Sequence, residues 1–235
     1  MDYKDYQIGQ KQNSFWFRAK ELLISRLLTK MVRKSKIKIL NIGCGTGSDL
    51  KTINKFGDTY IIDIDSKALS LISKKQYTEK KKASACDIPY KDEFFDVVLS
   101  FDVFEHIEED SKAFQESYRV LKKGGILIFS VPAFQSIFSS HDKALGHHRR
   151  YSKNILKKKL SLFNLSEFYY WNSTLFPFIA LIRLLKKNSP PAVDKQYNLK
   201  FLDGLLYELL NIESWSVQKG IKFPYGLSFI GICRK

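Results

Sequence analysis

Residues 37–65, IKILNIGCGTGSDLKTINKFGDTYIIDID, decide the expected fold. The apolar run Ile37 to Ile42 predicts a buried strand, the glycines that follow predict a tight turn, and Ser48 marks the start of a helix. A second apolar run, Thr59 to Ile62, predicts a neighbouring strand that ends on Asp63. Strand, turn, helix and strand in this order are the parts of a βαβ unit with a parallel sheet.

The glycine turn and Asp63 together indicate a site for a ligand that contains a ribose. Gly43 can adopt a positive φ, while Gly45 and Gly47 leave bare backbone at the N-terminus of the helix, where a ligand can lie. Asp63 follows Gly43 by 20 residues. It ends the next strand, where a carboxylate can accept hydrogen bonds from both ribose hydroxyls. A nucleotide-like cofactor is therefore expected.

The glycine spacing argues against NAD. The dinucleotide fingerprint is G-x-G-x-x-G, whereas these glycines run G-x-G-x-G and position 48 is serine. The pattern NIGCGTGSDL followed by IIDID resembles the first two motifs of class I S-adenosylmethionine-dependent methyltransferases. The resemblance implies S-adenosyl-L-methionine as cofactor and S-adenosyl-L-homocysteine as product. A glycine turn in another βαβ enzyme, such as an NAD-dependent oxidoreductase, is the alternative.

Later segments follow the order of that family. The resemblance implies an α/β fold, with a doubly wound, Rossmann-like sheet of seven strands in the order 3-2-1-4-5-7-6 and the last strand antiparallel. Sequence patterns predict the remaining strands at 83–87, 94–100, 125–131, 165–171 and 227–233. Helices are expected at 14–34, 66–75, 108–123 with a Lys-Lys-Gly-Gly C-cap, 152–162, 175–187 and 199–212.

The length of 235 residues suits a single domain, 1–235, with an insertion. A helical cap is expected from residues 13–34 and 174–212. Residues 175–187 are strongly apolar with a basic end. This pattern fits a helix on a membrane surface, the lining of an apolar substrate pocket, or a buried cap helix.

Composition limits the cellular setting and the partners. Three cysteines without metal-ligand spacing, a polar N-terminus and the lack of a long apolar run predict a cytoplasmic protein, with peripheral membrane contact as an option. The net charge of +15 comes mostly from lysines spread along the chain, as on a solvated surface. An anionic lipid partner is the second interpretation. Nucleic acid is disfavoured, because no aromatic-basic motif accompanies the charge.

The resemblance also implies which residues contact the cofactor. Asp87 is expected at the adenine amino group with Ile88 covering the ring, and the loop after the fourth strand is expected to face the pocket. Asp87 as a turn residue before proline, and Glu105 with His106 as a helix-capping pair, are the alternatives. The full predicted set is Asn41, Gly43, Cys44, Gly45, Gly47, Asp63, Ile64, Asp87, Ile88, Phe101, Asp102 and His106.

Residues 134–152, FQSIFSSHDKALGHHRRYS, contain three of the four histidines. They resemble an HD-x3-GH-x-RRYS segment of a subset of class I methyltransferases. The catalytic candidates are His141, His147 and Tyr151, because a histidine near neutrality can take the proton of an attacking hydroxyl.

Arg149 and Arg150 offer planar forks for a carboxylate or phosphate of the substrate. A structural loop whose arginines bind acids of the fold is the main alternative to this substrate site. A metal site from His141, Asp142, His147 and His148 is a weaker one, so no metal is assigned.

These expectations combine into one function. The chain is expected to methylate a small or lipid-linked, anionic metabolite. O-methylation is favoured slightly over N- or C-methylation, because a hydroxyl benefits from a base. The alternative from another class is a non-catalytic subunit that binds cofactor or partner in a methyltransferase complex.

Overall fold

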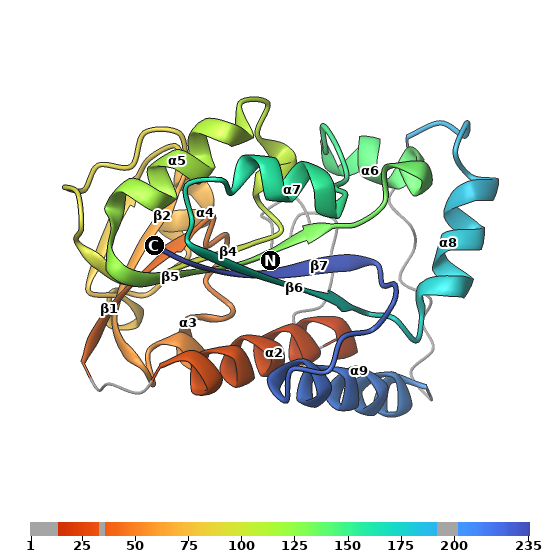
Figure 1. Cartoon of the computed structure of the whole chain (residues 1–235), viewed down its shortest axis with the longest axis horizontal. Helices are drawn as coiled ribbons and strands as arrows, with labels where there is room; N and C mark the ends of the chain where they lie inside the picture. Colours follow the sequence, from red (N-terminus) through yellow and green to blue (C-terminus); the bar gives the residue numbers. More distant parts are fainter. Residues whose placement is uncertain (1–13, 33–35, 192–201) are drawn as a thin grey trace.

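A computed structural model describes residues 14–32, 36–191 and 202–235. These residues form a seven-stranded sheet in the order β3-β2-β1-β4-β5-β7-β6 (Figure 1). Strand pairs are parallel except that β7 runs antiparallel to β5 and β6, so the predicted order and orientation are confirmed. The strands are β1 (Ile37–Ile42), β2 (Gly57–Asp63), β3 (Glu79–Lys82), β4 (Phe95–Phe101), β5 (Leu121–Pro132), β6 (Leu165–Trp171) and β7 (Ser228–Arg234).

Helices cover both faces of the sheet. In Figure 1, α2 and α9 lie below it, α5 and α7 lie above it, and α8 stands at one end of the molecule. The α-helices are α2 (Phe15–Met31), α3 (Leu50–Ile53), α4 (Ser66–Ser70), α5 (Asp110–Val120), α6 (Ser140–Leu145), α7 (Lys153–Lys159), α8 (Phe176–Leu185) and α9 (Asp203–Gln218). Short 3-10 helices are η1 (Lys74–Gln76), η2 (Phe104–His106) and η3 (Gln135–Ile137).

Two apolar layers hold the strands between the helices. Ile39 and Val97 pack with the buried face of α2 and α9, whereas Leu40 and Val98 pack with residues of α5 and α7 on the other face. All four side chains are almost fully buried. Burying one large apolar side chain stabilises the fold by about 1.5–3 kcal/mol. Because both faces are covered, the central strands read as nearly continuous apolar runs.

β7 fits between its neighbours through one glycine. Gly231 pairs with Phe129 of β5, and a Cβ at Gly231 would lie 2.2 Å from the Phe129 ring. The aromatic ring therefore packs directly on bare backbone, which explains a glycine in the middle of an interior strand.

The predicted strand at 83–87 is wrong. The third strand is β3, Glu79–Lys82, and Ser84 and Asp87 form only an isolated bridge beyond it. β3 is an edge strand with charged side chains, a composition that protects sheet edges from further pairing. Its lysines gave no apolar pattern, so the sequence predicted a loop there.

Several predicted helix ends are also wrong. α5 ends at Val120 and not at Lys123, because Leu121 already pairs with Phe95 in the sheet. The predicted glycine C-cap belongs to the start of β5. Likewise α4 ends at Ser70, and α9 continues to Gln218, beyond the expected end at 212.

The segments expected to form the cap have different surroundings. α2 and α9 form the layer on one face of the sheet, and α8 lies at the end of the molecule near α6 (Figure 1). Residues 13, 33, 34 and 192–201 of the predicted cap lie outside the described residues. Within the described residues, no helix is long and apolar enough to cross a membrane.

Candidate active site

The site lies along the carboxyl edge of the parallel strands. The glycine turn follows β1, Asp63 ends β2, and Asp102 follows β4. In an open α/β sheet this edge is where ligands bind. The elements therefore bring the two halves of the expected site, the glycine turn and the loop after β4, to one place.

Only glycine fits the first position of the turn. Gly43 has a φ of +66°, and a Cβ there would lie 2.4 Å from Cγ2 of Val103. The Gly43 N–H donates to the Ile62 carbonyl at 2.9 Å. The turn is thus bound to β2 and packed against the loop after β4.

The carboxylate of Asp63 is held in a fixed orientation. Its Oδ2 accepts from the Gly45 N–H at 2.8 Å, and its Oδ1 accepts from the Asp65 N–H at 2.9 Å. Each carboxylate oxygen can accept a further hydrogen bond, as two ribose hydroxyls would require. The next residue, Ile64, is 72% exposed. An exposed isoleucine beside this acid offers an apolar surface for a base, so these residues fit a nucleoside.

The other residues near the turn are buried. The Asn41 amide donates to the Asp49 carboxylate at 3.3 Å. Burial, together with the charges of Asp63 and Asp49, raises the pKa of the Cys44 thiol. Cys44 therefore offers its backbone, and not a reactive thiolate, to a ligand.

Asp87 and Ile88 have different surroundings. Asp87 is exposed beyond β3, and its N–H donates to the Ser84 carbonyl at 3.1 Å. Ile88 is only 2% exposed and packs in the core, and its N–H donates to Glu116. The side chain and the backbone N–H of Ile88 are therefore both engaged within the fold, and its contact with a cofactor ring stays a prediction.

Acids gather at this edge of a strongly basic chain. Burial lowers the pKa of Lys20, but Asp102, Asp49 and Glu105 outweigh this effect, so the pKa is raised. Burial, and next the charge of Asp49, raise the pKa of Glu21. The local field is therefore negative although the net charge is +15. Such an edge suits a cationic ligand.

Asp102 faces the site in a strained conformation. Its φ is +57°, and its carboxylate accepts from Lys20 Nζ and Ser130 Oγ, both at 2.6 Å. Burial opposes ionisation, but these two partners lower the pKa of Asp102. Backbone strain of this kind is concentrated at functional sites. The Lys20 ammonium lies 6.0 Å from the centroid of the Phe101 ring, and Phe101 is only 7% exposed.

Glu105 is a functional candidate that was not in the predicted set. It is 1% exposed, in η2, and its Oε2 has no hydrogen-bond partner among the described residues. Burial, followed by the charge of Asp102, raises the pKa of Glu105 well above its ordinary value. Its position after an apolar strand was the available signal, but helix capping explained the pattern equally well.

His147 is oriented by a buried acid. Its Nδ1 donates to Oδ1 of Asp142 at 3.0 Å. Asp142 also accepts from Arg150 Nε at 2.8 Å and from Arg183 Nη1 at 3.2 Å. Burial opposes its ionisation, but His147 and both arginines lower the pKa of Asp142. The structure thus leaves Nε2 of His147 as the nitrogen that faces a ligand.

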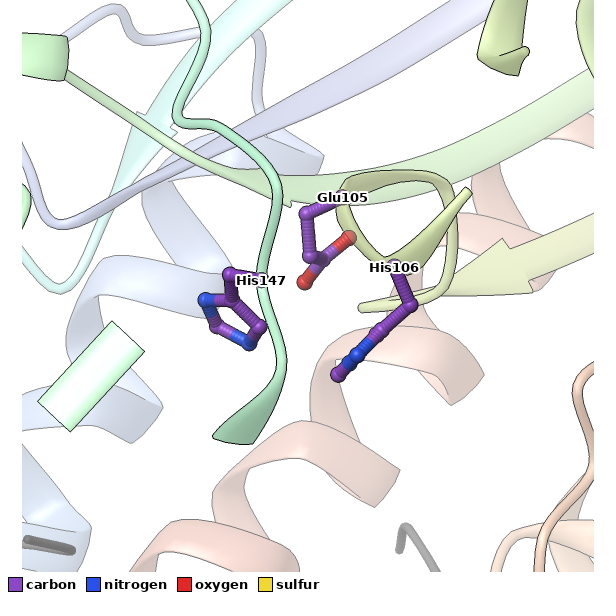
Figure 2. A group of neighbouring side chains, drawn as sticks. All are labelled: Glu105, His106 and His147. Atoms are coloured by element: carbon purple, nitrogen blue, oxygen red, sulfur yellow. The ribbon is translucent and has the colours of Figure 1, made fainter. Parts of the chain in front are cut away.

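His147 meets two residues of η2 across the site. The metal-ligating atoms of Glu105, His106 and His147 all lie within 4.8 Å of one another, and the two imidazole rings are 4.7 Å apart between centroids. We call these three residues the acid–histidine group. Figure 2 shows the Glu105 side chain between those of the two histidines. The set differs from the metal site considered from the sequence, because Asp142 is occupied by arginines.

The arginine pair supports the fold. Arg150 is 4% exposed, and it donates to Asp142 and to the Ala133 carbonyl. Arg149 donates to Asp110 Oδ1 at 2.9 Å and to the Glu108 carbonyl at 2.8 Å. Both arginines bind acids of the fold, as the structural alternative expects, and a role of this pair in holding a substrate acid stays a prediction.

Tyr151 is also structural. It is fully buried, and its hydroxyl donates to Asp110 Oδ2 at 2.7 Å. Burial and the charge of Asp110 raise its pKa. The hydroxyl is therefore part of the buried packing, and the catalytic role of Tyr151 stays a prediction. His141 lies in α6 directly before Asp142, and its catalytic role stays a prediction.

Two comparisons of sequence point to the same family. Residues 40–129 match the family model described as a methyltransferase domain. A Mycobacterium tuberculosis protein named as a probable S-adenosylmethionine-dependent methyltransferase is 29% identical over 121 residues, which are 51% of this chain and 43% of that protein. The ubiquinone biosynthesis O-methyltransferase of Pelagibacter ubique is 26% identical over 203 residues, 83% of this chain and 75% of that one.

Solved structures share the fold. The crystal structure of a SAM-dependent methyltransferase from Archaeoglobus fulgidus matches with a TM-score of 0.59 at 15% identity, covering 92% of this chain and 94% of that chain. At this identity the likeness concerns the fold alone. The chain spans about half the length of the first curated relatives it matches.

Proposed function

We infer that the chain is an S-adenosylmethionine-dependent methyltransferase of class I fold that transfers a methyl group to an acceptor hydroxyl. Residues 40–129 match the family model of a methyltransferase domain, and family and fold support S-adenosylmethionine as the cofactor. The observation that carries the proposal is the Asp63 carboxylate, fixed by the Gly45 N–H at the sheet edge. It stands at one end of a negative edge whose other end is the acid–histidine group.

The chain's own residues fit the parts of this cofactor. Asp63 accepts hydrogen bonds from the ribose hydroxyls, and the exposed side chain of Ile64 packs on the adenine. The exposed carboxylate of Asp87 accepts a hydrogen bond from the adenine amino group. The backbone of the glycine turn lies beside the methionine portion, at a helix N-terminus. When bound, the cofactor supplies a methyl group on a positively charged sulfonium, which suits the field of Asp102 and Asp49.

The protein's part in methyl transfer is alignment and activation of the acceptor. An in-line displacement needs the acceptor atom positioned and water excluded. A hydroxyl must also lose its proton, and the acid–histidine group lies at the edge where the acceptor would approach. The relative from Pelagibacter ubique is named as an O-methyltransferase, which supports oxygen as the acceptor atom.

We further propose that the acceptor is lipid-linked and that the enzyme works in the cytoplasm at a membrane surface. α8 exposes Phe178 at 64%, Leu181 at 57% and Leu185 at 76%. Lys186 and Lys187 follow this apolar surface directly. Apolar side chains beside lysines suit an anionic membrane surface. The arginine pair gives no support for an acid group on the acceptor.

Methyl transfer from labelled S-adenosylmethionine to fractionated cell extracts tests the proposal. We expect label in the lipid fraction, lost in Asp63→Ala and retained in Asp58→Asn, which changes an exposed acid of the same strand. Label only in the polar fraction would reject a lipid-linked acceptor. Label in neither, with S-adenosylhomocysteine bound, favours the non-catalytic subunit, and a co-purifying subunit should then restore turnover.

A further inference from the structure

The acid–histidine group has the composition of a transition-metal site. Two imidazoles and one carboxylate form a donor set that Zn²⁺ accepts in catalytic sites, with a further position left open. Ligand atoms around a tetrahedral ion with bonds of about 2.1 Å are about 3.4 Å apart. The observed atoms lie within 4.8 Å, so small rotations of the three side chains would bring them onto one ion.

Glu105 points to an occupant independently of this spacing. Its side chain is almost fully buried, yet Oε2 has no hydrogen-bond partner among residues 14–32, 36–191 and 202–235. A buried carboxylate oxygen without a partner is costly. In Figure 2 the Glu105 side chain lies between the rings of His106 and His147. A cation between the rings would pair this oxygen.

His147 has the support that metal-binding histidines usually have. Its Nδ1 donates to the buried Asp142 at 3.0 Å, so the lone pair is on Nε2. A carboxylate behind the ring fixes its tautomer and orientation and makes the ligating nitrogen more basic. Asp142 is itself held by Arg150 and Arg183, and this keeps the ring from turning away.

We propose that Glu105, His106 and His147 bind one divalent transition-metal ion of the Zn²⁺ type. The ion keeps an open position at the carboxyl edge of the sheet, where an oxygen of the acceptor binds. A bound hydroxyl ionises more readily and releases its proton to solvent, which leaves an oxyanion as the methyl acceptor. The inference rests on the proposed methyl transfer to oxygen. It makes His147 a metal ligand and not a free base.

Metal binding is tested on the untagged full chain after treatment with a chelator. Calorimetry should show one Zn²⁺ per chain, and Co²⁺ should give the visible absorption of a four-coordinate site. Glu105→Gln and His147→Ala should weaken Zn²⁺ binding by about 100-fold or more. His148→Ala is the matched control, because His148 is exposed and lies next to His147. It should bind Zn²⁺ as the wild type does.

Thermal melting shows whether each variant is folded. If His147→Ala does not fold, the test rests on Glu105→Gln, which keeps the shape of the side chain. Equal Zn²⁺ affinity in wild type and Glu105→Gln would overturn the site. So would Co²⁺ spectra that show only water ligands.

The metal site and the methyl transfer can fail separately. If the chelated, metal-free protein methylates the acceptor at the wild-type rate, the inference is overturned and the proposed function stands. If Zn²⁺ binds as expected but S-adenosylhomocysteine does not, the metal site stands and the proposed function falls. S-adenosylhomocysteine affinity is therefore measured with and without Zn²⁺ on the same preparation.

Discussion

At the residue scale, Asp142 decides the stability of the segment after β5. Its carboxylate is fully buried and binds Arg150, Arg183 and His147. Asp142→Asn leaves both arginines without their counter-charge and should lower the free energy of unfolding by about 3–5 kcal/mol at neutral pH. Asp92→Asn, whose side chain is 73% exposed beside Arg119, should cost about 1 kcal/mol or less. Urea denaturation measures both.

The lowered pKa of Asp142 also predicts how stability changes with pH. A carboxyl with a lower pKa in the folded state stabilises it fully above the ordinary value of about 3.9, and loses this as pH falls through the folded value. The wild type should therefore lose stability below about pH 4, and Asp142→Asn should lose less over that interval. Parallel curves for the two proteins would show that the ion cluster contributes nothing.

Asp63 is expected to carry much of the affinity for the cofactor. Hydrogen bonds to a charged group contribute about 1.5–3 kcal/mol, so Asp63→Asn should weaken S-adenosylhomocysteine binding by about 10–100-fold. The substitution keeps an oxygen for the Gly45 N–H, so the turn should survive. Calorimetry with Asp58→Asn as control checks this. Unchanged affinity in Asp63→Asn would remove the ribose assignment.

Residues whose partners are near in sequence could be predicted, and others could not. Asp63 and the glycine turn belong to one βαβ unit, so their spacing alone placed them together. Arg149 binds Asp110, and Asp142 binds Arg183 of α8, each about 40 residues away. No local pattern shows such a partner. The arginines were therefore assigned to a substrate when they bind acids of the protein.

At the scale of elements, the turn between β1 and α3 should tolerate an added side chain less well than a glycine turn that has open space around it. Gly43 and Gly124 both have positive φ, but a Cβ at Gly124 meets nothing within 4 Å, whereas one at Gly43 lies 2.4 Å from Val103. Gly124→Ala should cost about 1–2 kcal/mol for the backbone alone. Gly43→Ala should cost more because of the clash.

Val103→Ala added to Gly43→Ala should recover the part due to the clash, which urea denaturation of the three variants would measure. If Gly43→Ala costs no more than Gly124→Ala, then the loop after β4 moves away easily and the turn is not packed as described.

Strand and helix types were predicted better than their ends. Interior strands are buried on both faces and show it as apolar runs, so β1, β2, β4 and β7 lie close to the expected ranges, as does the edge strand β6. The edge strand β3 has no such run. The change from α5 to β5 depends on the pairing of Leu121 with Phe95, which no pattern within residues 108–131 could indicate.

At the scale of the whole molecule, charge and the apolar face of α8 should act together. We expect the protein to bind vesicles that contain anionic lipid, less at high salt, and not vesicles of neutral lipid. The double variant Phe178→Ser, Leu181→Ser should bind less. Leu71→Ser is the control, because it removes an apolar side chain that is 51% exposed at the end of α4 and not on α8. It should leave vesicle binding unchanged. Sedimentation with vesicles measures this, and equal loss in both variants would remove α8 from the membrane contact.

The sheet order could not be worked out from apolar patterns, and it came from the family resemblance. Its most unusual feature has a consequence for biosynthesis. β7 is made after β5 and β6, yet it lies between them. While a ribosome is still translating residues before 228, β6 has no sheet to join and β5 has a bare edge. Chaperones that shield exposed strands should therefore bind nascent chains that stop before β7, and release them once it is made.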